Sequence, residues 1–297
     1  MSIKIGTRGS KLALLQTGTV AKRLNDLGIS TEQVIIHTAG DTTTQVPLHE
    51  IGGQGVFVRA LDDAILAGEI DCAVHSMKDI PAYRPSGLIT AAILKRDSAA
   101  DFIAYRGSLS NVKVVGTSST RRRAQLLRHD PAVTVKDLRG NVDTRIRKMS
   151  GGEYDAIILA EAGLTRMDIH IQGERLPPEK FVPSPNQGTI AVVCRADPSL
   201  REVLSALDHP QTRTDVMIER AVMEQLGGGC FTPLGIYCRA GHLIAEVLSL
   251  DGTRAERVET DVKTIEEARD QGRALRVRAL GLIDEAYKQL GITGASS

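Results

Sequence analysis

The sequence has 297 residues, of which 42% are hydrophobic and 25% are charged. This length allows two or three domains with sizeable cores. The composition is ordinary for a soluble protein. The formal net charge of +1 argues against a generally cationic nucleic-acid binder.

Targeting and redox signals are few. A strand pattern begins at the second residue, where a signal peptide would have its charged and apolar regions, and no apolar stretch approaches the length needed to span a bilayer. The four cysteines are Cys72, Cys194, Cys230 and Cys238, and they form no C-x-x-C pair and no metal-type spacing with histidine. We therefore expect a reduced, cytoplasmic protein without a bound metal, in which Cys72 and Cys194 are small core residues.

Strand and helix patterns alternate over the first 94 residues, as in a largely parallel sheet with helices on both faces. Apolar runs predict strands over residues 3–7, 33–38, 72–75 and 88–94. Helical spacing of apolar residues predicts a helix capped by Ser10 and a second helix around residues 57–65. Residues 39–54 form a polar loop rich in Thr and Gly.

The alternation begins again after residue 111. We predict strands over residues 112–115, 133–135, 156–160 and 190–194. Helices are expected over residues 120–128 and 141–149, with a short helix ending near Met167 and an irregular, proline-rich segment over residues 177–188. From Thr212 onward, a helix (216–226) precedes three strand patterns (234–239, 243–250, 256–261) and a long helix (265–290). This last part suggests a small α+β domain.

Four side chains that can donate, accept or carry charge lie between a short apolar strand and Pro81: His75, Ser76, Lys78 and Asp79. In an open α/β sheet, ligands bind just beyond the carboxyl ends of the strands, where this cluster would fall. A carboxylate there could stabilise a developing positive centre, or exchange protons if burial raises its pKa. The other interpretation is an ordinary polar loop after a strand.

Positive charge is concentrated in one part of the chain. Residues 113–148 include ten Lys or Arg and three Asp or Glu, a net charge of +7 that leaves −6 for the remainder. Within this segment, a turn of three hydroxyl residues precedes Arg121 and Arg122 at a predicted helix start. Helix N-termini favour anions, and arginine adds bidentate donors for carboxylate or phosphate.

Two other expected strand ends repeat this arrangement, namely Arg8 with Ser10, and Arg139 with Asn141 and Arg145. A faint internal echo between residues 7–10 and 117–121 suggests two similar α/β lobes that face each other across a cleft. Each turn by itself could be a capped helix with solvated arginines. Together, the three turns predict a site for a ligand with several negative charges.

Cys230 follows three glycines, which have no side chains to enclose its thiol. A thiol in such a segment could carry a covalently attached group. The alternative is a plain glycine-rich helix stop.

The chain resembles the porphobilinogen deaminase (hydroxymethylbilane synthase) family over nearly its whole length. In the first lobe the resemblance rests on Thr7-Arg8-x-Ser10, Gly52-Gly53-x-Gly55-x-Phe57 and Ala73-Val74-His75-Ser76-Met77-Lys78-Asp79. It continues with Val115-Gly116-Thr117-Ser118-Ser119-x-Arg121-Arg122, Leu138-Arg139-Gly140-Asn141-Val142-x-Thr144-Arg145, Tyr154-Asp155-Ala156-Ile157-Ile158-Leu159-Ala160 and Gly228-Gly229-Cys230.

The resemblance implies an activity and a cofactor. Four porphobilinogen units would lose ammonia and be joined head to tail into a linear tetrapyrrole, hydroxymethylbilane. The chain would grow on a dipyrromethane cofactor, linked through a thioether to Cys230. Since each pyrrole carries an acetate and a propionate, the growing chain accumulates carboxylates that arginines can bind.

The resemblance also implies the roles of individual residues. Asp79 matches the catalytic carboxylate, and Phe57 matches an aromatic residue that lies beside the ring being joined. The other residues expected to bind cofactor or substrate are Arg8, Ser10, Ser76, Lys78, Thr117, Ser118, Ser119, Arg121, Arg122, Arg139, Gly140, Asn141, Arg145, Arg166, Gln187 and Gly188.

Members of this family have two lobes similar to periplasmic binding proteins, with a mostly parallel mixed sheet in each, and a C-terminal domain that bears the cysteine. For this chain we expect an α/β fold with lobes at 1–94 plus 190–210 and at 95–189, and an α+β domain at 211–297. The sequence departs from frequent family choices at Glu50, Gln54, Thr120, Asp143 and Asn186. These departures affect expected loop contacts rather than the core chemistry.

Two other functions compete with this interpretation. A non-catalytic, two-lobed binding protein for a small polycarboxylate anion would explain the arginines, but it gives no role to Asp79 or to Cys230. Nucleic-acid binding through residues 121–123 lacks interleaved aromatic residues and a basic isoelectric point. We therefore expect porphobilinogen as the partner, with no nucleic acid or membrane, and a monomer as is usual in the family.

Overall fold

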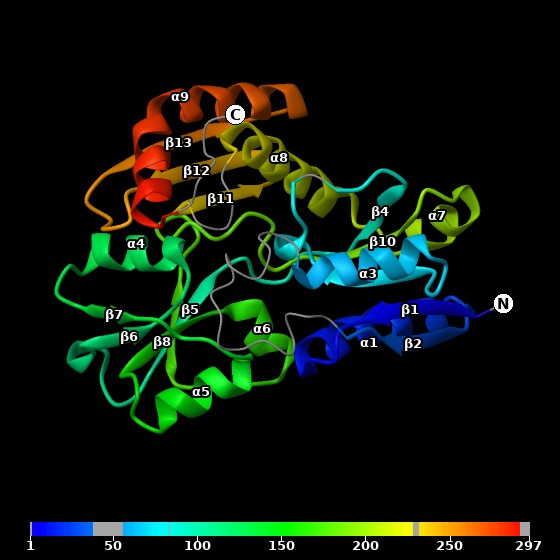
Figure 1. The fold of residues 1–297 in the computed structure, drawn as a ribbon, viewed down its shortest axis with the longest axis horizontal. Coiled ribbons are helices and arrows are strands. Elements are labelled where there is room, and N and C mark those ends of the chain that lie inside the picture. Colours follow the sequence, from blue (N-terminus) through cyan, green and yellow to red (C-terminus); the bar gives the residue numbers. More distant parts are fainter. Residues whose placement is uncertain (1, 38–55, 83, 228–231, 292–297) are drawn as a thin grey trace. The chain divides into compact units, whose positions relative to one another are not determined.

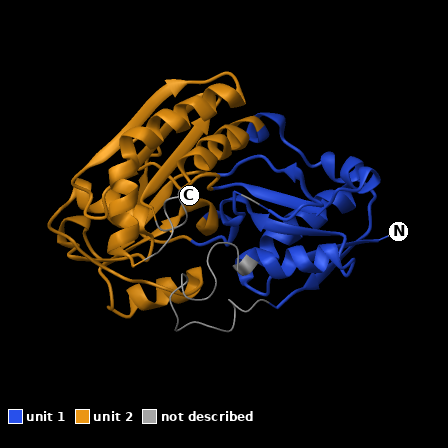
Figure 2. Cartoon of the chain, turned by 45° about the horizontal axis from the view of Figure 1, so that its top comes forward, with its two compact units in different colours: residues 1–97, 165–169, 188–213 blue, residues 98–164, 170–187, 214–297 orange. Residues whose placement is uncertain are grey.

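The structure, a computed structural model, describes residues 2–37, 56–82, 84–227 and 232–291, without the side chains of Val56 and Phe57. The chain divides into two compact units (Figure 2). The first unit contains Met1–Asp97, Thr165–Ile169 and Gly188–Arg213, and the second contains Ser98–Leu164, His170–Gln187 and Thr214–Ser297. The predicted loop over 39–54 lies outside the described residues.

The first unit is built on a five-stranded sheet (Figure 1). In spatial order the strands are β2 (Thr31–Ile35), β1 (Ile3–Thr7), β3 (Cys72–Ser76), β10 (Ile190–Arg195) and β4 (Leu88–Ile93). β1 runs parallel to β2 and β3, whereas β10 is antiparallel to β3 and β4. Its helices are α1 (Lys11–Asp26), α3 (Val56–Leu66) and α7 (Pro198–Ser205).

Alternation along β1 explains how the helices cover this sheet, because successive strand residues point to opposite faces. Ile5 belongs to a buried cluster with Leu24 of α1. A Cβ built on the next residue, Gly6, would lie 3.0 Å from Leu61 of α3. The two helices therefore pack on opposite faces, and glycine at position 6 permits the close approach of α3.

The second unit contains a sheet with the same plan. Its strands, in spatial order, are β7 (Thr134–Lys136), β6 (Val114–Gly116), β8 (Ala156–Ala160), β5 (Asp101–Tyr105) and β9 (Gly173–Leu176). β6, β7 and β8 are parallel, as β1, β2 and β3 are, and the antiparallel β5 takes the position of β10. Its helices are α4 (Thr120–His129), α5 (Val142–Ser150) and α6 (Glu161–Arg166). The predicted echo between the two lobes is thus confirmed as a shared topology.

The C-terminal part of the second unit is an antiparallel sheet with two helices, of which the first has its first four residues in the first unit. β11 (Leu234–Arg239), β12 (His242–Leu248) and β13 (Ala255–Asp261) pair in sequence order, with α8 (Pro210–Leu226) before them and α9 (Ile265–Gln289) after them. This part has its own buried cluster, which includes Val222, Ile236 and Leu275. Together with the two mixed sheets, it confirms the predicted α/β fold class.

The sequence patterns missed three elements and shifted others by a few residues. β5 begins with a charged residue, β9 is a charged edge strand (Gly-Glu-Arg-Leu), and α7 is short. Charged edge strands are common because they discourage pairing with other chains, but charge also weakens the apolar signal of a strand. β2 begins two residues before its predicted start, and α8 begins six residues before it.

Among the described residues, the helices include none whose length and apolar content would let it cross a membrane. The predicted core cysteines, Cys72 and Cys194, are fully buried and lie opposite each other in the β3–β10 register.

Candidate active site

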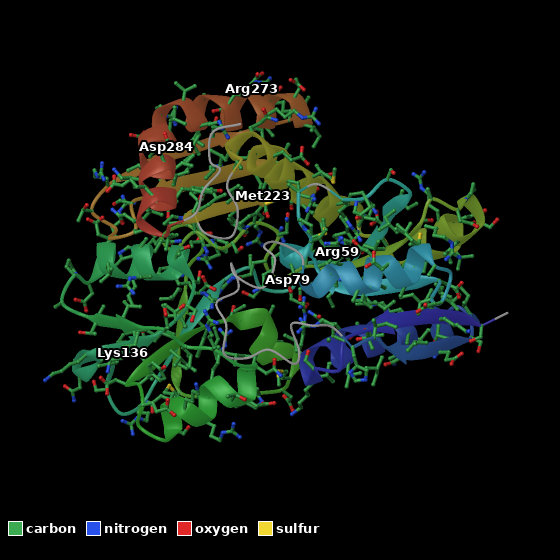
Figure 3. All side chains as sticks on the ribbon, in the orientation of Figure 1. Arg59, Asp79, Lys136, Met223, Arg273 and Asp284 are labelled. Atoms are coloured by element: carbon green, nitrogen blue, oxygen red, sulfur yellow. The ribbon has the colours of Figure 1, made fainter. Side chains whose placement is uncertain are left out.

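A pocket of about 80 Å³ lies in the first unit at the carboxyl ends of β1 and β3. It is lined by Arg8, Ser10, Leu12, Ala13, Gln16, Val58, Val74, His75, Ser76 and Asp79. Figure 3 labels Asp79 beside α3, the helix that also carries Arg59. Two motifs far apart in the sequence therefore line one cavity, the first with Arg8 and Ser10 and the second with Ser76 and Asp79.

Local hydrogen bonds position the hydroxyl groups of this pocket. Ser10 caps α1, since its Oγ accepts a hydrogen bond from Ala13 N at 3.3 Å. Ser76 is held by Gln16, whose Nε2 donates to Ser76 Oγ at 2.9 Å. Because Gln16 is buried within α1, this bond ties the end of β3 to the helix that follows β1.

A single turn of 3-10 helix, η1 (Met77–Asp79), places Asp79 at the pocket. The backbone N–H of Met77 donates to Thr189 O at 2.9 Å, and that of Ile80 donates to Met77 O at 3.2 Å. The side chains of Met77 and Ile80 are both buried. The turn is thus anchored on each side of an exposed Asp79.

The electrostatic surroundings of Asp79 act in two directions. The protein atoms packed around its carboxyl raise its pKa above the ordinary value, while the positive charges of Lys78 and Arg8 lower it. Desolvation is the larger effect. Asp79 is therefore exposed, yet its carboxyl protonates more readily than that of an ordinary aspartate. The positive charge of Lys78 opposes the rise in pKa, as expected, but its effect is smaller than that of desolvation.

A buried ion cluster in the second unit contains Arg121 and Arg122, which lie in the first turn of α4. Both pair with Asp101, the fully buried first residue of β5. Arg121 Nη1 lies 2.8 Å from Asp101 Oδ2, and Arg122 Nη2 lies 2.7 Å from Oδ1. Arg121 also donates to Val182 O, and Arg122 to Ile158 O, each at 2.9 Å. The alternative of solvated arginines is wrong for these two, because both guanidinium groups lie in the interior of the unit.

Positive charge exceeds negative charge within this cluster. Burial of Arg145, and then the nearby charge of Arg122, lowers the pKa of Arg145 to about 10. Two guanidinium groups, those of Arg121 and Arg122, pair with the single carboxylate of Asp101, an excess of one positive charge among these three groups, and Arg145 adds a further positive charge near Arg122. Such an excess fits a ligand that brings carboxylates of its own.

The hydroxyl groups of residues 117–119 are used within the second unit. Ser119 Oγ accepts from Arg122 N at 3.4 Å and caps α4. Ser118 Oγ donates to Leu138 O and accepts from Leu138 N, each at 3.0 Å. Thr117 Oγ1 accepts from Ser119 N at 3.2 Å. The capping interpretation is therefore confirmed for Ser119, as it is for Ser10.

The third predicted turn, residues 139–145, follows β7 and runs into the first residues of α5. Asn141 stands at the N-cap position of α5, but its side chain makes no capping hydrogen bond. Gly140 has a φ of 114°, and its carbonyl accepts a hydrogen bond from Arg145 Nε at 2.7 Å. Arg139 is half-buried. The geometry of this turn thus depends on glycine at position 140, and a hydrogen bond joins the Arg145 side chain to the carbonyl of that glycine.

The remaining predicted residues fall in both units. In the first, Arg166 Nε donates to Asp97 Oδ2 at 2.8 Å and its Nη2 donates to Gly188 O at 2.7 Å. In the second, the buried Gln187 Nε2 donates to Asp101 Oδ1 at 2.9 Å and to Ala99 O at 2.8 Å. Gln187 is therefore a further partner of the carboxylate that binds Arg121 and Arg122.

Comparison with known proteins assigns the family. The family model "Porphobilinogen deaminase, dipyromethane cofactor binding domain" matches residues 3–202, and "Porphobilinogen deaminase, C-terminal domain" matches residues 213–281. The chain belongs to the porphobilinogen deaminase family.

Curated relatives agree over nearly full length. The chain is 49% identical to a protein of Methanosarcina acetivorans named probable porphobilinogen deaminase, over 96% of this chain and 95% of that protein. It is 44% identical to a protein of the same name from Archaeoglobus fulgidus, over 95% of this chain and 100% of that protein. Among solved structures, the methionine-binding protein MetQ is similar at 13% identity and a TM-score of 0.41, covering 75% of this chain and 94% of that chain.

Two of the predicted site residues cannot be placed. Cys230 and the side chain of Phe57 lie outside the described part of the chain. The N-terminal family match is to a cofactor-binding domain, and the cationic cluster around Asp101 has the donor chemistry that a carboxylate-rich pyrrole cofactor requires. The described residues therefore fit such a cofactor.

Sequence analysis missed Gln16 and Asp101. Gln16 is a polar residue on the buried side of α1, and such a residue does not stand out within a helical pattern of apolar residues. Asp101 is an acidic residue directly before the apolar run of β5. This position was the one sign in the sequence that its carboxylate could have a buried partner. The structure explains why asparagine is accepted at position 186, one of the departures from the family. Asn186 has a φ of 64°, a conformation that favours glycine and that asparagine tolerates.

Proposed function

We propose that this protein removes ammonia from four porphobilinogen units and joins them head to tail into hydroxymethylbilane, as a transferase of the porphobilinogen deaminase family. One observation carries the proposal beyond the family match: the pocket brings the Asp79 carboxyl together with Arg8, Ser10 and Ser76. A non-catalytic anion-binding protein is not favoured by the match to this enzyme family.

Asp79 is the proposed catalytic residue. When ammonia leaves the substrate, positive charge develops on the pyrrole unit, and a fixed carboxylate nearby stabilises that charge. The pKa of Asp79 is raised toward neutral pH, so its carboxyl can donate and accept a proton more readily there than an ordinary aspartate. Both roles require that a bound substrate can reach the carboxyl, and Asp79 lines the pocket.

The arginines and their neighbours are the proposed binding groups for the carboxylates of substrate and product. Arg8 would serve the pocket of the first unit. The excess of positive charge where Arg121 and Arg122 pair with Asp101 supports the same role for these two residues, and the nearness of Arg145 to Arg122 supports it for Arg145. Further proposed binding residues, for which the family resemblance is the support, are Ser10, Phe57, Ser76, Lys78, Thr117, Ser118, Ser119, Arg139, Gly140, Asn141, Arg166, Gln187 and Gly188.

Cys230 is the proposed attachment point of the dipyrromethane cofactor, through a thioether. When bound, this cofactor supplies the pyrrole end to which the first substrate unit is joined. We also propose three domains, at 1–94 plus 190–210, 95–189 and 211–297, and a cytoplasmic monomer, as the resemblance implies. The separate buried cluster of the C-terminal part supports the third domain.

The test of the proposed function is an Asp79→Asn variant, compared with Asp63→Asn as a matched control. Asp63 is an exposed acidic residue of α3 that does not line the pocket. We expect Asp79→Asn to lose about 10²–10⁴-fold in ammonia release from porphobilinogen, with the melting temperature of the wild type. Near-normal turnover in Asp79→Asn, or equal losses in both variants, would refute the role of Asp79.

A further inference from the structure

His75 is a polar residue of the pocket that the proposed function leaves without a role. It lies in β3 opposite Ala191 of β10, is 6% exposed, and lines the cavity with Arg8 and Asp79. Its Nε2 is buried and has no hydrogen-bond partner in the part of the chain that the structure describes. Since a buried polar group without a partner is costly, a packing role alone would be served better by an apolar ring.

The surroundings of His75 keep its ring neutral. Burial, followed by the charges of Arg84 and Arg8, lowers the pKa of His75 to about 3. Arg84 is itself held by the buried Asp62 of α3, so its charge is fixed in place. A neutral imidazole carries one N–H donor and one acceptor nitrogen.

The charges around the ring select the group that it can bind. Arg84 is ion-paired with Asp62, and Asp79 in the same pocket can take the cationic end of the substrate. Arg8 lines the pocket with the ring and attracts an anion. An N–H donor at Nε2 adds a directed hydrogen bond to that attraction. A carboxylate in the pocket would therefore lie beside the positive charge of Arg8 and accept a hydrogen bond from the buried nitrogen.

We propose that His75 is a further substrate-binding residue, whose neutral imidazole donates a hydrogen bond from Nε2 to a carboxylate of the pyrrole bound beside Arg8 and Asp79. This inference rests on the proposed function, since it takes the acetate or propionate of porphobilinogen as the ligand. It assigns the Nε2–H tautomer to His75 in the bound state.

Two substitutions separate binding from packing. His75→Phe keeps a ring of similar shape and removes the donor, whereas His75→Gln places an amide N–H near the position of Nε2. We expect His75→Phe to raise the KM for porphobilinogen about tenfold to hundredfold, the range for losing a hydrogen bond to a charged group. Its kcat should change much less, its melting temperature should not fall, and His75→Gln should recover most of the KM.

A binding measurement avoids dependence on turnover. Both substitutions are made in the Asp79→Asn holoprotein, and porphobilinogen binding is measured by calorimetry. The Kd should rise about tenfold or more with His75→Phe and less with His75→Gln.

Unchanged KM and Kd in His75→Phe would overturn the inference while leaving the proposed function in place. Equal losses in both variants, with lower melting temperatures, would show a packing role and overturn it as well. Absence of porphobilinogen turnover in the wild type would refute the proposed function, and the inference with it, before any variant is made.

Discussion

Asp101 is the residue on which the buried cluster of the second unit depends, and Asp101→Asn is the most informative substitution there. Its side chain is fully buried and contacts Arg121, Arg122 and Gln187. Asparagine keeps the shape but removes the charge, so two guanidinium groups stay buried without their counterion. Removing one partner of a buried ion pair costs about 3–5 kcal/mol. We expect a loss of this size in the free energy of unfolding.

The chain offers a selective optical probe for this measurement. It contains no tryptophan and five tyrosines, and Tyr105, Tyr154, Tyr237 and Tyr287 belong to the second unit. Tyrosine fluorescence during urea denaturation therefore reports mainly on the unit that holds Asp101. The matched control is Asp270→Asn, which removes an exposed acidic partner of Arg273 on α9. An exposed pair of this kind contributes less than about 1 kcal/mol.

The pH dependence gives a second check on the same residue. Burial alone would raise the pKa of Asp101, but Arg121 and Arg122 together hold it well below its usual range. A carboxyl with a depressed pKa in the folded state stabilises the protein above its unfolded pKa of about 4, and this stabilisation is lost as the pH falls below that value. The difference in stability between wild type and Asp101→Asn should therefore shrink below about pH 4. A loss at neutral pH no larger than that of the control would refute the reasoning.

Two further predictions concern α4 and its neighbours, each checked by denaturation. Gly252→Ala should lower the free energy of unfolding by more than about 2 kcal/mol, because φ is 74° and the new Cβ would lie 2.2 Å from Ala124 O of α4. The control is Gly28→Ala, where φ is 80° and nothing lies within 4 Å, so the loss should be only about 1–2 kcal/mol. Equal losses in the two variants would contradict the contact with α4. Ser119→Ala should cost about 0.5–2 kcal/mol through the lost cap on α4, and an unchanged stability would show that the cap contributes nothing.

The sequence patterns predicted the fold well where a strand is a continuous apolar run. The bounds of β8 and β11 agree with their predicted ranges to the residue, because these strands are buried along most of their length. β5 was missed for a physical reason: its first residue is a charge whose partners, Arg121 and Arg122, lie twenty residues later in α4. Local sequence cannot show that a distant helix will neutralise an acidic residue.

In the candidate site too, local sequence predicted some features, whereas contacts between distant residues could not be predicted. Strand ends and helix caps predicted that Arg8, Ser10, Ser76 and Asp79 would meet, because the carboxyl ends of neighbouring strands in an open α/β sheet lie at one edge of the sheet. The burial of Arg121 and Arg122 could not be predicted, since an arginine at a helix start is usually solvated. The pairing of Gln16 with Ser76 joins residues sixty positions apart, and no local pattern encodes it.

The intact mass of the purified, active protein tests the central claim most directly, namely that synthesis is primed on a pyrrole cofactor held by Cys230. The account predicts that the wild type exceeds the mass of its sequence, 32.0 kDa, by two linked pyrrole units, and that Cys230→Ala has the mass of its sequence alone. An active wild type with no added mass, or a Cys230→Ala variant that keeps the addition, would contradict it.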